Sequence, residues 1–370
     1  MDPNVILKAA IERQEVSAIE ALMLMQQEDP IFADIFQVAN EVNRRTNQGI
    51  VSFTHRSHVF YTNVSRASSK HCSYFRKKGD KEAFTLTADE VVAKIAGSPA
   101  KSDVAIQGAL NPDLSIEYLV RLVSAVREQY PHIHIHAFSP TEIFFASRRA
   151  RVPAREILAQ LKEAGLDSMP GTGADILNDK VRKKISPDRI RTADWVDVVK
   201  TAHHMGIKTT ATIVVGHVEN EIHICEHIEI LRNIQKETGG FVEFQIIPHV
   251  PEPAPGAEVR PRMTQQQLMK LVAVCRVFFG QIIPNIQSPW VLYGMPEAVQ
   301  TLSVGANDLG GTHFHQGAYY QASSGPKYTA PEILEKAILK AQRRPKLRDS
   351  VYQDGSRKAQ KTRRLAMAAR

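Results

Sequence analysis

The sequence contains few cysteines, no long apolar run and no secretory h-region. Its three cysteines, Cys72, Cys225 and Cys275, are widely spaced, which argues against a disulfide framework. The longest apolar runs, such as ATIVV at residues 211–215, are far shorter than a membrane span. The first residues, MDPNVILKAAIERQE, are mixed in charge and resemble no secretory signal. These absences predict a cytoplasmic protein with no membrane partner.

Acidic residues are scarce at the C-terminal end of the chain. The net charge is +8, but residues 336–370 hold 12 Lys and Arg against 2 Asp and Glu, which leaves −2 for residues 1–335. The positive excess therefore belongs to a basic tail. A tail of this kind is usually a solvated chain end, and no aromatic residues alternate with the charges to stack on bases. The composition therefore argues against a nucleic-acid partner.

The chain divides into a helical beginning and a long alternating part. Within residues 4–47, the segments VSAIEALMLMQQ and IFADIFQVANEVNRR place apolar residues with helical periodicity. After them, short β-branched runs alternate with helical patterns, and the runs lie at residues 58–63, 104–109, 132–138, 167–171, 209–216, 242–248, 284–289 and 302–307. Eight strands separated by helices predict an α/β fold, a (β/α)8 TIM-type barrel. We expect N-terminal helices at 1–49, the barrel at 50–325, and a C-terminal helix with the basic tail at 326–370.

Small and polar residues follow six of the predicted strands. The segments are TNVSRASSKHC, QGALNP, AFSPTE, PGTGAD, VGHVEN and GANDLGG. Functional residues of such barrels lie at the C-terminal ends of the strands, so these segments predict one polar mouth.

The first of these segments has the spacing of a metal-binding loop without most of its ligands. Ser65, Ser69 and Cys72 follow an x3 and then an x2 spacing. Three thiolates at this spacing would hold three irons of an iron–sulfur cluster and leave the fourth open to a small molecule. Soft iron–sulfide binds thiolates far better than alcohols, and serine offers a neutral hydroxyl.

Eight segments carry a resemblance to a known family. They run in family order from about residue 50 to residue 325, and they are YTNVSRASSKHCSYFRK, IQGALNP, HIHAFSPTEI, AGLDSMPGTGADIL, GIKTTATIVVGHVE, RNIQKETGGFVEF, NIQSPWV and GANDLGGT. Through them the sequence resembles the radical S-adenosylmethionine enzymes of the deazaflavin and futalosine group. It is most similar to the deazaflavin-precursor synthase subunits that join tyrosine to a ribitylaminouracil. The resemblance implies a complete (β/α)8 barrel.

The resemblance also implies cofactors, substrates and a reaction. The cofactors are S-adenosylmethionine and a 4Fe-4S cluster, and the substrates are L-tyrosine and 5-amino-6-(D-ribitylamino)uracil. A 5′-deoxyadenosyl radical takes a hydrogen atom from tyrosine, and the released 4-hydroxybenzyl radical adds to the uracil. A partner radical enzyme subunit is a further expectation. A closed, dry barrel mouth suits this chemistry because it keeps water away from radicals.

Cys72 matches the third cluster cysteine, and Ser65 and Ser69 occupy the other two cluster positions. With one thiolate the cluster is expected to be lost or weak, so the coupling activity is disabled or altered. Two explanations of the serines remain open, a deliberate replacement and a natural paralogue that has given up redox chemistry. Two other functions also remain open. One is an aminofutalosine synthase-like enzyme of menaquinone biosynthesis, favoured by Gly173, and the other is a non-catalytic metabolite-binding paralogue.

The cofactor-binding residues implied by the resemblance are Tyr74, Gln107, Gly108, Ser139 and Glu142. Gln107 and Gly108 match the segment that contacts the methionine amine and carboxylate, although a strand end would also explain the glycine. Ser139 and Glu142 match contacts to the ribose or amino group of the cofactor. The alternative for Glu142 is a structural role at a helix N-terminus, which favours carboxylates.

Catalytic roles are assigned to His136 and His217 together with Glu142. His132, His134 and His136 share one strand face, and we interpret His136 as a substrate contact in preference to a metal ligand. The predicted substrate-binding residues are Thr172 and Asp175 on a Gly-rich turn, Glu219, Asn307 and Asp308. Helix capping is the structural alternative for the last two.

Overall fold

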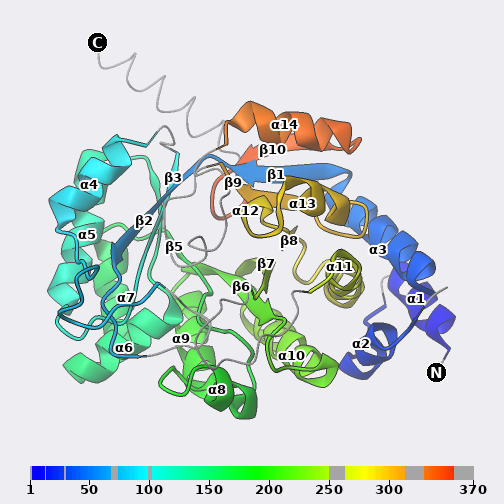
Figure 1. Cartoon of the computed structure of the whole chain (residues 1–370), viewed down its shortest axis with the longest axis horizontal. Coiled ribbons are helices and arrows are strands. Elements are labelled where there is room, and N and C mark those ends of the chain that lie inside the picture. The colour runs from blue at the N-terminus through cyan, green and yellow to red at the C-terminus, as the bar shows by residue number, and fades with distance from the viewer. Residues whose placement is uncertain are drawn as a thin grey trace.

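The structure is a computed structural model that describes residues 2–12, 14–28, 31–67, 74–98, 102–249, 263–312 and 329–353. Its centre is a curled parallel sheet, and helices surround the outside of that sheet (Figure 1). Ser69, Cys72 and most of the basic tail lie outside the described residues.

Ten strands form the sheet in the described part of the chain, and all their pairings are parallel. Their order is β10-β1-β9-β8-β7-β6-β5-β4-β3-β2. The strands are β1 (Ile50–Thr54), β2 (Arg56–Thr62), β3 (Asp103–Gly108), β4 (His134–Ala137), β5 (Ser168–Met169), β6 (Lys208–Val215), β7 (Phe241–Pro248), β8 (Ile286–Gln287), β9 (Asp308–Gly311) and β10 (Arg344–Arg348).

The helices follow the alternation that the sequence predicts. They are α1 (Pro3–Ile11), α2 (Ala18–Met25), α3 (Ile31–Asn47), α4 (Ala88–Ala96), α5 (Ile116–Gln129), α6 (Pro140–Ala150), α7 (Ala154–Glu163), α8 (Asp179–Ile185), α9 (Thr192–His204), α10 (Glu221–Thr238), α11 (Gln265–Phe279), α12 (Trp290–Tyr293), α13 (Met295–Thr301) and α14 (Pro331–Lys340). In Figure 1, α1 to α3 lie against α10 and α11, outside the barrel.

One continuous segment of the chain contributes strands near both ends of the curled sheet. Only His55 separates β1 from β2, so one continuous segment forms both strands. β1 pairs with β9 and β10, whereas β2 pairs with β3. In the described part of the chain, no strand pairing joins β2 to β1 or β10, so the curled sheet has a seam that the chain crosses at His55, with β10 as an extra strand beside β1. The predicted (β/α)8 barrel class is confirmed, with this seam as the difference from a regular barrel.

The C-terminal region departs from the sequence prediction. Residues 344–348 were expected to belong to a basic tail, but they form β10, which pairs with β1 from Ile50↔Arg344 to Thr54↔Arg348. Arg348 is 1% exposed. The segment RPKLR has no strand-like apolar alternation, and its partner lies almost 300 residues earlier, so local periodicity could not reveal it.

The strand predicted at 302–307 is also wrong. Residues 302–305 continue α13 as turns, with local backbone bonds such as Val304 N–H to Thr301 O at 3.1 Å. Leu302, Val304 and Ala306 are all buried, so their alternation reflects packing of these turns on the core. β9 begins six residues later than predicted, at Asp308.

The outer helices form where the sequence repeats apolar residues every three or four positions. In α5, Leu119, Leu122, Val123 and Val126 are at most 5% exposed and face β2 to β4, and Ser115 caps the first turn. Burying each such side chain contributes roughly 1.5–3 kcal/mol. Two core clusters result, one around β2 to β4 and one that joins the other half of the barrel to the N-terminal helices.

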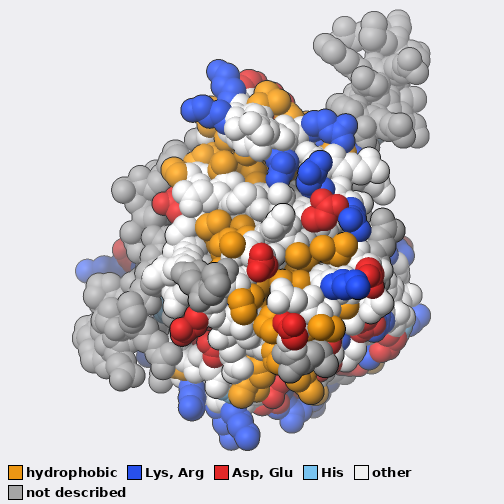
Figure 2. All heavy atoms as spheres, turned by 90° about the vertical axis from the view of Figure 1, so that its right-hand side faces the viewer, with side chains coloured by type: hydrophobic (Ala, Val, Ile, Leu, Met, Phe, Trp, Pro, Cys, Tyr) orange, Lys and Arg blue, Asp and Glu red, His pale blue; other side chains and the backbone are white. Residues whose placement is uncertain are grey.

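The face that carries the N-terminal helices is chemically mixed. Figure 2 shows hydrophobic side chains there interspersed with Lys, Arg, Asp and Glu. Among the described helices, none is both long enough and apolar enough to cross a membrane.

Candidate active site

The loop after β2 uses its first serine internally. The Ser65 hydroxyl donates to the Ala67 carbonyl at 2.8 Å and accepts from the Ala67 N–H at 3.2 Å. The Ser65 N–H donates to the Arg76 carbonyl at 2.9 Å. This hydroxyl therefore shapes the loop backbone.

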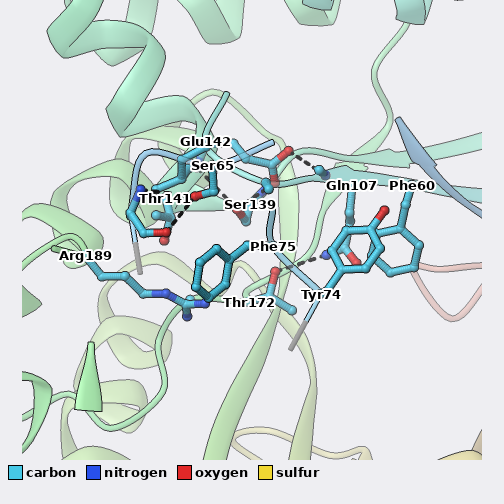
Figure 3. A pocket seen from close by; sticks show the side chains of 15 residues that line it. Phe60, Ser65, Tyr74, Phe75, Gln107, Ser139, Thr141, Glu142, Thr172 and Arg189 are labelled. Carbon is cyan, nitrogen blue, oxygen red and sulfur yellow. Dashed lines mark hydrogen bonds between the residues drawn. The ribbon is translucent and has the colours of Figure 1, made fainter. Parts of the chain in front are cut away.

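A first pocket, here named the outer pocket, lies at the C-terminal ends of β2 to β5 (Figure 3). Its lining includes Phe60, Ser65, Tyr74, Phe75, Gln107, Thr141 and Arg189. The Tyr74 ring contacts the Phe60 ring at a centroid distance of 4.9 Å, and Phe60 stacks on His58 at 4.5 Å. The structure therefore places the predicted Tyr74, Gln107, Gly108, Ser139, Glu142 and Thr172 around one cavity with Ser65.

A second pocket, here named the inner pocket, lies inside the barrel. Its polar lining includes His58, His136, Thr210, Glu243, Gln245 and Gln287. Gln107 and Thr172 line both pockets. Gln107 Oε1 lies 3.0 Å from His58 Nε2, and Gln107 Nε2 donates to Thr172 Oγ at 3.0 Å. These two residues therefore form the boundary between the pockets.

Glu142 connects three elements behind the outer pocket. One carboxylate oxygen accepts from the Ser139 N–H and hydroxyl, both at 2.7 Å, in a capping box that begins α6. The other oxygen accepts from Tyr61 Oη at 2.8 Å and from the Gly108 N–H at 3.1 Å. Burial raises the pKa of Glu142 to about 7, against the lowering effect of the hydrogen bonds from Ser139, Tyr61 and Gly108. Ser139 and Glu142 therefore have the structural role at the helix N-terminus that was the alternative to cofactor binding. Both residues also line the outer pocket.

Two glycines of the outer pocket have no room for a side chain. A Cβ at Gly108 would lie 2.5 Å from the Tyr61 ring, and a Cβ at Gly173 would lie 2.2 Å from Thr141 Oγ. Gly173 also has a φ of +84°, which favours glycine. Thr141 Oγ is buried in the pocket wall and has no hydrogen-bond partner among the described residues.

His136 lies in the inner pocket and is 3% exposed. Its Nδ1 lies 2.7 Å from Ser168 Oγ, and burial lowers its pKa well below the ordinary value, helped by Arg56. His134 lies behind it, bound to the same serine at 2.8 Å. The described residues include no group of three or more His, Cys, Asp or Glu that could hold a metal ion.

Asp175 does not line the outer pocket itself but binds Arg189, which does. Its two carboxylate oxygens accept from Arg189 Nη1 at 3.0 Å each, and Arg189 lines the pocket. His217 and Glu219 line neither of the two pockets and pair with each other at 2.9 Å. Burial raises the pKa of Glu219, but the hydrogen bond and charge of His217 outweigh it and bring the pKa to about 2.

Asn307 precedes β9 and Asp308 begins it, whereas the sequence predicted that both lie at the C-terminal end of a strand. The Asn307 amide oxygen accepts from Arg276 Nη2 at 2.9 Å, and Asp308 pairs with Arg348 Nε and accepts from Ser52 Oγ at 2.6 Å. Neither residue lines the outer or inner pocket. Their expected position at the mouth is corrected, because it depended on the strand predicted at 302–307.

The inner pocket contains polar residues that motif reasoning missed. Glu243 and Gln245 lie two positions apart on β7, so both point to the same side of the sheet. The sequence VEFQIIP already shows these two polar residues at alternate positions of a predicted strand. Polar residues at alternate positions of an otherwise apolar strand indicate a polar cavity on one face of the sheet. Gln287 and Arg189 carried no comparable signal, because their segments are short or irregular.

Comparisons with known proteins identify the family of the chain. The radical SAM superfamily model matches residues 59–231, and the model of the CofH/MqnC C-terminal region matches residues 256–361. A 5-amino-6-(D-ribitylamino)uracil–L-tyrosine 4-hydroxyphenyl transferase of Methanococcus maripaludis strain C7 is 36% identical over 353 residues, covering 93% of this chain and 98% of the relative. This chain belongs to the radical SAM superfamily, in the family of these transferases. A transferase of the same name from Gloeobacter violaceus is 35% identical over 363 residues and covers 94% and 93% of the two chains.

Two solved structures share the fold. Methylornithine synthase superposes with a TM-score of 0.71 at 14% identity, covering 92% of this chain and 97% of that one. The FeFe-hydrogenase maturase HydG from Carboxydothermus hydrogenoformans gives a TM-score of 0.73 at 14% identity, with coverages of 95% and 80%.

The superfamily implies S-adenosylmethionine and an iron–sulfur cluster, and the two groups fit this chain differently. The outer pocket fits a nucleoside sulfonium, because it combines aromatic rings with polar groups and the unpartnered buried hydroxyl of Thr141. The cluster does not fit the donor set. The loop supplies one thiol, Cys72, and the Ser65 hydroxyl is bound to Ala67. Neutral hydroxyls are poor ligands for iron–sulfide.

Proposed function

We propose that this chain binds S-adenosylmethionine in the outer pocket and 5-amino-6-(D-ribitylamino)uracil in the inner pocket, and does not carry out the radical coupling to tyrosine by itself. The single observation that carries the proposal is the pair of pockets that share Gln107 and Thr172, next to a loop with one thiol. The relatives named as transferases of the same uracil support the choice of substrate.

The inner pocket suits a ligand with many hydrogen-bonding groups. Gln245 Nε2 donates to Gln287 Oε1 at 2.8 Å, and Gln287 Nε2 donates to Glu243 at 3.0 Å. These bonds orient both amides before any ligand arrives, which reduces the entropy lost on binding. A ribityl chain with its hydroxyls and a uracil with its amide edges supply matching partners.

Calorimetric titration of the full chain tests the binding assignment. Thr141→Val removes the unpartnered hydroxyl at nearly constant shape, so we expect S-adenosylmethionine to bind about threefold to tenfold more weakly, as for one lost hydrogen bond. The same variant should bind the ribitylaminouracil unchanged. Gln245→Leu should show the reverse pattern. Equal effects of either variant on both ligands, or no binding of either ligand to the wild type, would contradict the two-pocket assignment.

Anaerobic reconstitution tests the catalytic part. Iron and sulfide are offered to the unmodified chain and to Ser65→Cys/Ser69→Cys, and bound iron and cleavage of S-adenosylmethionine are measured. We expect both only in the double variant, because it restores three thiolates at the cluster spacing. Comparable iron uptake and cleavage by the unmodified chain would show that the proposal of a disabled cluster loop is wrong.

A further inference from the structure

The C-terminal segment, defined here as residues 344–353, reaches the floor of the inner pocket. Arg348 Nη2 donates to Glu243 Oε2 at 2.8 Å, and Tyr352 Oη donates to the same oxygen at 2.6 Å. Ser350 donates to Asp103 Oδ2 through its N–H at 2.7 Å and its hydroxyl at 2.6 Å. This segment therefore packs its polar groups into the N-terminal end of the barrel.

A buried row of polar side chains connects this segment to the pocket wall. Asp349 Oδ2 lies 3.8 Å from His134 Nδ1. His134 Nε2 lies 2.8 Å from Ser168 Oγ, and the same oxygen lies 2.7 Å from His136 Nδ1. His134, His136, Ser168 and Asp349 are all at most 3% exposed.

The protons in this row are coupled, because a serine hydroxyl has one hydrogen and lies between two histidines. If Ser168 donates to His134, it must accept from His136 Nδ1–H, which leaves His136 Nε2 without a proton. If Ser168 donates to His136, then His136 Nε2 carries the proton and His134 Nε2 donates to the serine. A neutral imidazole carries only one N–H, so each choice also decides the state of His134 Nδ1.

The position of Asp349 distinguishes the two arrangements. Its Oδ1 accepts from the N–H groups of Val351 and Gln353 at 3.0 and 2.9 Å, so its Oδ2 is the atom turned to His134. A distance of 3.8 Å is too long for a hydrogen bond, but in a buried site a carboxylate still attracts an N–H and repels a nitrogen lone pair. A proton on His134 Nδ1 is therefore favoured. His134 Nε2 then accepts from Ser168, and Ser168 accepts from His136.

We propose that Asp349, His134 and Ser168 are positioning residues that hold His136 with its proton on Nδ1, so that His136 Nε2 accepts a hydrogen bond from a ligand in the inner pocket. His136 Nε2 has no hydrogen bond to any described residue, and the side chain lines the pocket. Burial lowers the pKa of His136 well below its ordinary value, which agrees with a neutral ring.

A second acceptor faces the same cavity. Glu243 Oε2 accepts from Gln287, Arg348 and Tyr352, whereas Glu243 Oε1 accepts from none of the described residues. These two acceptors suit ligands that present N–H or O–H donors, such as the ring imide and amino groups of an aminouracil. The naming of that ligand rests on the proposed function, while the tautomer of His136 does not.

The tautomer can be read directly by nuclear magnetic resonance. The full chain is labelled with ¹⁵N in its histidine rings, and the His136 signals are assigned by their loss in His136→Gln. We expect the wild type at neutral pH to show a protonated Nδ1 and an unprotonated Nε2 at His136. A protonated Nε2 at this residue would overturn the inference, whatever the protein binds.

Two variants test the positioning residues. Ser168→Ala and Asp349→Asn should each convert His136 from one tautomer to a mixture, because they remove the bridge and the charge that select it. Both should weaken ribitylaminouracil binding about threefold to tenfold and leave S-adenosylmethionine binding in the outer pocket unchanged. An unchanged His136 tautomer in both folded variants would contradict the positioning role. If the wild type shows the expected tautomer but binds no ribitylaminouracil, the proposed function fails and the assignment of His136 stands.

Discussion

Glu142 and Glu90 show at the residue scale how one sequence pattern serves two purposes. Each is the N3 residue of a capping box, three positions after the N-cap residue, which is Ser139 for α6 and Thr87 for α4. Glu90 is exposed, and the hydrogen bonds from Thr87 lower its pKa. Glu142 is buried, and burial raises its pKa to about 7. The sequence pattern is the same, and the position in the fold decides the chemistry.

The stability of the protein should therefore depend on pH through Glu142. A carboxyl whose pKa is raised by folding stabilises the folded state fully below its ordinary value of 4.5, and this contribution is lost as the pH rises through about 7. The loss amounts to roughly 3 kcal/mol. We expect Glu142→Gln to remove this part of the pH dependence of the free energy of unfolding between pH 5 and 8, measured by denaturant titration.

The matched control for this measurement is Glu90→Gln, which alters the same motif at an exposed site. It should leave the pH dependence in this range unchanged. If Glu142→Gln and the wild type lose the same stability between pH 5 and 8, then Glu142 does not titrate there in the folded protein.

At the scale of the element, β10 shows how a short charged strand can complete a barrel. Arg348 is surrounded by the carboxylates of Asp308 and Glu243 and by the Tyr352 ring, whose centroid lies 3.9 Å from the guanidinium carbon. Burial raises the pKa of Glu243, although the charge of Arg348 opposes this. Removing one partner of such a buried group leaves uncompensated charge inside the protein.

Arg348→Met should accordingly lower the free energy of unfolding by about 3–5 kcal/mol. The matched control is Lys346→Met on the same strand, where the side chain is exposed and the expected change stays within about 0.5 kcal/mol. Denaturant unfolding of the two variants measures the difference. Equal stabilities would mean that β10 does not contribute to the folded barrel in solution.

At the scale of the whole molecule, the N-terminal helices complete the outer layer of the barrel. α2 packs on α10 and α11, and it buries Ala21, Leu24 and Met25. Polar contacts add to this packing, because Arg232 Nη1 donates to the Val16 carbonyl at 2.5 Å and Lys236 pairs with Glu15. These helices, in the region where the sequence predicts N-terminal helices packing on the barrel, share one hydrophobic core with it.

Deleting residues 1–28 should therefore expose the apolar faces of α10 and α11. We expect a chain that binds a hydrophobic dye and loses near-ultraviolet circular dichroism while it keeps helical signal. Glu15→Gln is the control, since loss of an ion pair at the surface costs at most about 1 kcal/mol. A truncated chain that unfolds as cooperatively as the wild type would show that the helices are dispensable.

Local sequence patterns predicted the alternating elements, the polar strand ends and the vacant cluster loop. Gln107, Thr172 and Glu142 could be assigned to one mouth because each lies at or just after the C-terminal end of a recognisable strand, and parallel strands end at the same edge. The loop spacing also indicated without any coordinates that thiolates are missing.

The tertiary structure alone decided the role of Asp308 and the place of the C-terminal segment. Asp308 looked like a mouth residue until β9 was seen to begin there, where Arg348 neutralises it. His134, Ser168 and Asp349 come from three distant parts of the chain and form one buried row. Periodicity reports only what neighbours along the chain share, whereas the partners of a buried charge or proton depend on how the barrel brings distant segments together.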